Sequence, residues 1–64
     1  MKEEKTKHEI FEQKYPAKEL ADSPMLCAEA IGYLKALMFY FPQEKEWVEI
    51  SLSMLTLIIL LNAS

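Results

Sequence analysis

The carboxyl-terminal segment WVEISLSMLTLIILLNAS, residues 47–64, contains a single charged residue, Glu49. On a helical wheel, at about 100° per residue, its apolar side chains fill an arc of roughly 220°. A helix on the surface of a globular protein needs an apolar stripe of only about 100°. The segment therefore predicts a helix with more apolar surface than a single neighbouring helix of the same chain can cover.

The chain is too short to bury this apolar surface in a core of its own, and it lacks the disulfides or metal sites that stabilise many small proteins. With 64 residues it lies near the lower size limit for a self-supporting core. Its one cysteine, Cys27, cannot form an intrachain disulfide, and Cys27 with the lone His8 cannot complete a four-ligand zinc site. We therefore expect self-association or a protein partner to bury the remaining apolar surface.

The first 23 residues form a charged arm and linker. Residues 1–24 hold 11 of the 17 charged residues and only 7 of the 33 hydrophobic ones. The segment before Pro16 has a helix-forming composition and predicts a short or frayed helix, and the segment that follows it predicts a linker with one helical turn. We expect an arm that is flexible or partly helical.

Two prolines divide the rest of the chain, residues 24–64, into two helices. Ser23 suits an N-cap, and Pro24 suits the first helical position, where its missing N–H costs nothing. Pro42 ends the first helix and opens the second, so the predicted helices are 24–41 and 42–62. Because their connection is short, they should be antiparallel neighbours. The fold class is therefore all-α, an antiparallel helical hairpin preceded by the arm.

The first helix adds to the excess of apolar surface. Opposite its broad aliphatic face it carries three small residues, each four positions apart, and two adjacent aromatic residues. The small residues are consistent either with a solvated face or with a groove for another helix, since small-xxx-small spacing is a packing device. We expect two copies to form a four-helix bundle, or more copies to form a larger helical oligomer. The predicted oligomer and partner interface comprises Ala28, Gly32, Ala36, Phe39, Tyr40, Trp47, Ile50, Met54, Ile58 and Leu61.

A membrane anchor is the alternative explanation of the apolar tail. The apolar stretch of residues 47–61 is about 22 Å long as a helix, whereas spanning takes about 20 apolar residues. Glu49 lies near its start, and the preceding flank is net acidic, which is not a positive-inside signal. Glu49, Ser53 and Thr56 form a polar stripe that suits a soluble assembly. The sequence favours assembly over membrane insertion.

Residues that could carry chemistry are few. Glu4, His8 and Glu12 would share one side of a helical arm, as a weak divalent-cation site or, far more commonly, as a solvated face. Cys27 lies on the aliphatic face, where burial makes a thiol inert. The net charge of −3 argues against nucleic-acid binding, and only the five lysines of residues 1–18 favour it. We expect no enzyme activity, no metal and no cofactor.

The sequence thus predicts a small non-enzymatic protein–protein interaction module of the adaptor or inhibitor type, acting as a helical homo-oligomer on an unidentified protein partner. Regulators of phages and mobile elements are often chains of this size, which is an association and not a deduction. A free cysteine and a polar start predict the cytoplasm. The alternative function is a small membrane-associated protein anchored by its apolar carboxyl-terminal helix.

Overall fold

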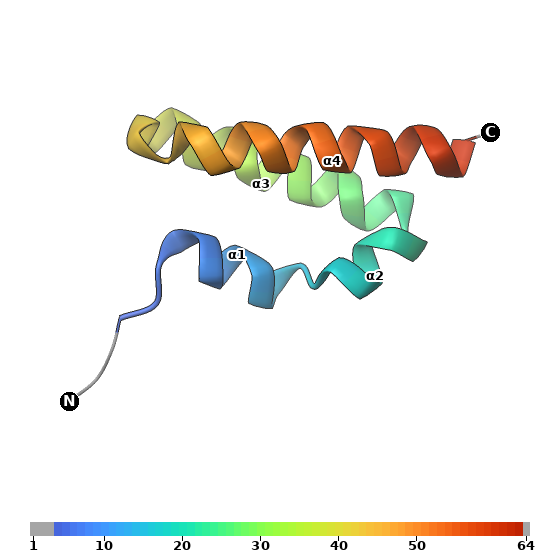
Figure 1. The fold of residues 1–64 in the computed structure, drawn as a ribbon, viewed down its shortest axis with the longest axis horizontal. Helices are drawn as coiled ribbons and strands as arrows, with labels where there is room; N and C mark the ends of the chain where they lie inside the picture. The colour runs from blue at the N-terminus through green and yellow to red at the C-terminus, as the bar shows by residue number, and fades with distance from the viewer. Residues whose placement is uncertain (1–3, 64) are drawn as a thin grey trace.

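The computed structural model describes residues 4–63, and all regular structure among them is helical (Figure 1). The all-α prediction is therefore confirmed. The elements in chain order are α1 (Lys7–Lys14), α2 (Ala17–Asp22), α3 (Pro24–Tyr40), the 3-10 turn η1 (Pro42–Glu44) and α4 (Lys45–Ala63).

Helix α1 begins with a capping box. The Thr6 hydroxyl accepts a hydrogen bond from the Glu9 backbone N–H at 3.1 Å, and the Glu9 carboxylate accepts one from the Thr6 backbone N–H at 2.9 Å. The hydrogen bond from the Thr6 backbone N–H, followed by the interaction with the Thr6 side chain, lowers the pKa of the Glu9 carboxyl. Two otherwise unsatisfied N–H groups are paired in this way, so a short charged segment begins as a defined helix.

Helix α3 starts where the sequence predicts. The Ser23 hydroxyl accepts from the Leu26 backbone N–H at 3.2 Å, and Pro24 occupies the first helical position. The helix ends at Tyr40, just before Pro42, because a proline offers no N–H to continue the helical ladder. Pro42 then opens η1 instead of starting α4 directly, so the second long α-helix begins three residues later than predicted.

Helices α3 and α4 lie side by side and run in opposite directions, and the arm formed by α1 and α2 runs along one side of them (Figure 1). The arm is tied down at α2, where the Cys27 thiol donates to the Leu20 carbonyl at 3.1 Å and the Asn62 amide donates to the Ala21 carbonyl at 3.4 Å. The sequence predicts only a linker with one turn at this position.

The core is thin. Its buried side chains come from the facing sides of α3 and α4 and from one residue of each arm helix: Phe11, Leu20, Cys27, Ala30, Leu34, Val48 and Leu55. A ring of half-buried aromatic and aliphatic side chains, including Tyr15, Tyr33 and Leu37, packs around them. The core therefore uses one face of each long helix and leaves the other faces in solvent.

The molecule is correspondingly open. It measures 46 × 24 × 15 Å, and its radius of gyration of 12.3 Å exceeds the value of about 11 Å typical of a compact domain of this length. Its accessible surface of 5068 Å² exceeds the value expected for a 7.5 kDa monomer by about 800 Å². Part of this excess belongs to the extended residues 4–6, and exposed side chains of α3 and α4 contribute to the rest.

Replacing Leu34, which is fully buried between α3 and α4, should show how much the thin core contributes. Leu34→Ala should lower the free energy of unfolding by about 2–5 kcal/mol, through lost burial and the cavity that remains. Lys35→Ala, next to it on the exposed side, should change it by less than about 0.5 kcal/mol. Urea unfolding followed by circular dichroism at one fixed protein concentration gives both values, and equal effects would contradict the assignment of Leu34 to the core.

Candidate interaction surface

Four large apolar side chains stand on the outer side of α4. Ile50, Met54, Leu57 and Leu61 are each between 57% and 67% exposed. Their spacing of four, three and four residues is that of the a and d positions of a heptad repeat, which is the pattern by which one helix packs along another. We call these four residues the α4 seam.

A second row with the same spacing lies on the other side of α4. Val48, Leu52, Leu55 and Ile59 are buried or half-buried and pack in the core. At 100° per residue the two rows lie roughly 150° apart on the helix. Helix α4 thus has two surfaces suited to helix packing, and within residues 4–63 only the inner one is covered.

The polar stripe of α4 lies beside the seam. Glu49, Ser53 and Thr56 are exposed, and the Thr56 hydroxyl donates to the Leu52 carbonyl at 2.9 Å. Leu60, at 61% exposed, interrupts the stripe. The α4 seam is therefore bordered by solvated positions on this side, as the core of an interface is bordered by its rim.

Trp47 belongs to the predicted interface, and the structure places it against the chain's own arm. Its indole N–H donates to the Glu44 carboxylate at 2.6 Å, and its ring stacks on His8 with centroids 4.4 Å apart. Phe11 approaches the same indole at 5.9 Å. Trp47 therefore fastens α1 to the beginning of α4.

An apolar groove separates the arm from the outer side of α4. It has a volume of about 340 Å³ and is lined by residues of α1, α2 and α4, among them Phe11, Tyr15 and Ile58. Ile58, another predicted interface residue, is half-buried here and packs against the core. Ile50 and Met54 line the same groove, so the groove and the α4 seam form one continuous apolar surface.

The small residues of α3 face open space. Ala28, Gly32 and Ala36 are all exposed, and a Cβ atom added at Gly32 would meet nothing within 4 Å. No described part of this chain packs against the stripe. Both of its interpretations, a solvated face and a contact for another chain, are compatible with this geometry.

A patch of exposed aromatic side chains lies at the carboxyl-terminal end of α3. Phe39 and Tyr40 are 78% and 71% exposed and meet edge to face at 5.2 Å. Next to them along the chain, the Phe41 ring lies 4.3 Å from the Lys7 ammonium. Exposed aromatic neighbours of this kind are characteristic of a binding surface.

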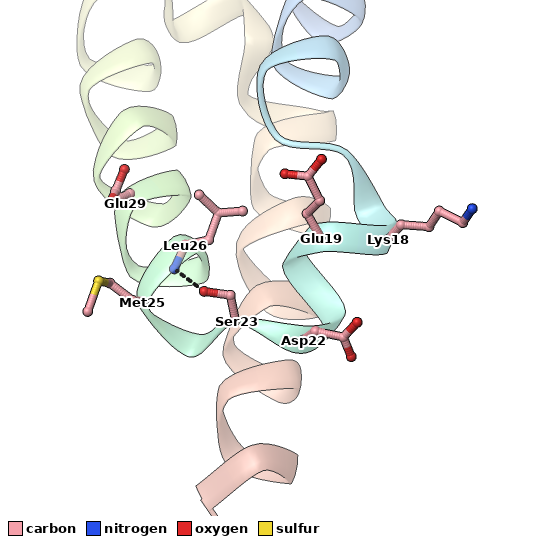
Figure 2. Close-up of a pocket in the computed structure, with 7 residues that line it drawn as sticks. All are labelled: Lys18, Glu19, Asp22, Ser23, Met25, Leu26 and Glu29. Atoms are coloured by element: carbon pink, nitrogen blue, oxygen red, sulfur yellow. Dashed lines mark hydrogen bonds between the residues drawn. The ribbon is translucent and has the colours of Figure 1, made fainter.

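An open depression between α2 and the start of α3, of about 650 Å³, contains Glu19, Asp22 and Glu29 (Figure 2). Figure 2 shows Asp22 and Lys18 on one side of it and Glu29 on the other, so the carboxylates do not converge. The Ser23 hydroxyl at its floor is already engaged in capping α3. The depression is therefore a charged surface in which the side chains do not converge on one point.

The residues considered for catalysis or metal binding are not assembled into a site. His8 and Glu12 approach at 3.6 Å with both side chains largely in solvent. Within residues 4–63 no three His, Cys, Asp or Glu side chains are placed to hold a metal ion. Burial raises the pKa of the Cys27 thiol, which keeps it protonated and a poor nucleophile.

Comparisons with family profiles, with curated protein sequences and with solved structures give no significant match. The described residues include one helical stretch, Pro42–Ala63, that is long and apolar enough to cross a membrane by length and composition. Only 11% of its most apolar window is buried in this chain. This stretch is longer than the sequence-based estimate, which counted only the apolar residues 47–61.

The sequence-based interface omits Leu57 and Leu60, both of which are exposed on α4. The signal that identifies Leu57 is the heptad spacing from Ile50 to Leu61, which a helical wheel at 100° per residue blurs into a broad arc. Of the predicted set, the structure keeps Ile50, Met54, Leu61 and the exposed residues of α3 on the surface, and it turns Trp47 and Ile58 toward the arm and core.

The open space at Gly32 leads to a simple test. Gly32→Ala should raise the free energy of unfolding by about 1 kcal/mol, because alanine loses less backbone entropy in a helix and has room for its Cβ. Ala36→Gly, on the same stripe, should lower it by a similar amount. Urea unfolding checks both. A loss of stability in Gly32→Ala would mean that another chain packs closely against this stripe.

Proposed function

We propose that this chain is a small non-enzymatic protein–protein interaction module, of the adaptor or inhibitor type, which acts as a helical homo-oligomer. The observation that carries the proposal is the α4 seam, four exposed apolar side chains in heptad spacing on a helix whose inner row is already packed. Contiguous exposed apolar surfaces mark sites that bind another protein or a membrane.

A second copy of the chain is the partner that fits this seam best. A stable interface removes about 800 Å² from each partner, and the exposed apolar side chains of α4 are part of a surface excess of that order. The seam is a straight row of aliphatic residues and can pack against its own copy, as isologous dimer interfaces do. Two copies joined through α4 would bring four long helices together, and further contacts at the small-residue stripe of α3 would extend the assembly.

Binding of another protein would use the surfaces that remain. Phe39 and Tyr40 are exposed in the last turn of α3, and aromatic residues are enriched in binding hot spots. The charged arm, with Lys5, Lys14 and Lys18 exposed, would supply a polar rim. The buried free thiol is compatible with a reducing compartment, so we propose the cytoplasm as the place of action.

A charge in the seam should dissociate the oligomer. We expect native protein in detergent-free buffer to sediment as a dimer or larger species, and Leu57→Lys to sediment at the monomer mass while its far-ultraviolet spectrum stays helical. A lysine there would be desolvated without a counter-charge. Thr56→Lys, its neighbour on the polar stripe, is the matched control and should keep the native mass. A folded native monomer at micromolar concentration would refute the self-association.

A second candidate function is supported by the length of the apolar helix. Pro42–Ala63 is long enough to cross a membrane, and its outer side is apolar and exposed, so the chain could be anchored through α4. Glu49 and the polar stripe oppose this, since a carboxylate deep in a bilayer costs about 2.5–3.5 kcal/mol even on the insertion scale.

Flotation with vesicles separates the two functions. Under the assembly proposal, native protein purified without detergent should remain at the bottom of a gradient with phosphatidylcholine and phosphatidylserine vesicles, and Thr56→Lys should behave in the same way. Under the anchor alternative, native protein should float with the vesicles, and Thr56→Lys, with a charge at the middle of the span, should float less. Flotation of the native protein in high salt would favour the anchor.

A further inference from the structure

We infer that two copies of this chain pair through antiparallel α4 helices, with Met54 of each copy packed against the partner's Leu57. The inference rests on the proposed self-association and adds its orientation and register. In this register Ile50 lies opposite the partner's Leu61, so the four residues of the α4 seam form complete layers and leave none unmatched.

The charges of α4 favour this orientation. All of them, Lys45, Glu46 and Glu49, lie in the first turn and a half, and the helix from Ile50 onward has none. Glu44 of η1 adds another carboxylate at the same end. A parallel pair would gather the carboxylates of both chains at one end, where like charges repel. In the antiparallel register, the two Glu46 residues lie roughly 28 Å apart along the axis, several screening lengths away from each other.

The helix dipoles act in the same direction. Two parallel helices place like ends together, and α4 has no basic residue in its last turn to offset the negative end. In an antiparallel pair each carboxyl-terminal end lies near the positive amino-terminal end of the partner helix. The orientation therefore improves two electrostatic interactions, and its apolar layers use the same four residues as a parallel pair would.

The engagement of Trp47 fits the same register. Heptad spacing continued toward the amino terminus would make Trp47 the next seam residue, three positions before Ile50. Its indole is instead held by His8 and Glu44 of its own chain and is half-buried. In the antiparallel register, Trp47 lies beyond the last seam layer and needs no partner. In a parallel pair, two indoles already committed to their own arms would have to meet at one level.

Disulfide trapping distinguishes the orientations. In a Cys27→Ala background of unchanged mass and helicity, Ile50→Cys and Leu61→Cys are prepared separately, one of them labelled with nitrogen-15. Oxidised alone, neither should form a covalent dimer, because like positions lie about 16 Å apart along the axis, beyond the roughly 7 Å that a disulfide allows. After mixing and exchange, the pair should form a covalent dimer of mixed isotopic mass.

The other outcomes overturn specific parts of the inference. Covalent dimers from each variant alone would establish a parallel pair and leave self-association standing. No covalent dimer in any sample, with native protein that sediments as a dimer, would show that the α4 seam is not the interface. No covalent dimer and a monomeric native protein would overturn the proposed function as well.

A probe outside the seam checks the result without altering any packed residue. Glu46 is exposed at the beginning of α4. Spin labels on Glu46→Cys, in the same Cys27→Ala background, should give a distance near or above about 28 Å in the antiparallel dimer. A parallel pair would hold the helix axes about 10 Å apart at this level and give a much shorter distance. A short distance would therefore reject the orientation.

Discussion

The structure depends on one constraint: α4 is apolar on two sides, and the helices within residues 4–63 cover only one of them. Val48 and Leu55 pack against α3, and this contact defines the core. Ile50, Met54 and Leu57, on the other side, face solvent. No helix in the described part of the chain covers this second surface, and we propose that a second copy of the chain covers it.

The arm shows how a charged segment contributes to so small a core. Each of its helices is too short to be stable alone in water. The capping box of Thr6 and Glu9 starts α1, Phe11 and Leu20 each place one apolar side chain in the core, and the His8–Trp47 stack fixes the amino-terminal end. The arm therefore widens the core on one side only and leaves the α4 seam outside it, with the apolar groove between them.

The parts predictable from the sequence are those set by local chemistry. Ser23 and Pro24 begin α3 as expected, and Pro42 ends it, because capping and the missing N–H of proline act within a few residues. The Thr6–Glu9 capping box has a local signature and was also within reach of prediction. The orientations of Trp47 and Ile58 could not be predicted from the sequence, because they depend on where the arm docks, and the arm is many residues away in the sequence. A helical wheel of α4 shows more apolar surface than one neighbouring helix can cover, but it does not show which part of that surface the arm and α3 cover.

If the seam is covered by a second copy, association adds to the stability of a fold that the monomer already has. A monomer with so thin a core would be marginally stable, and pairing through α4 would add stability in proportion to the logarithm of protein concentration. A protein partner with its own apolar helix would then compete for the seam. It would have to bind the seam more tightly than the second copy does, but it would not have to disrupt the core of the monomer. Under the proposed function, the chain would exchange its own copy for another protein while α3 stays folded, as an adaptor or an inhibitor must.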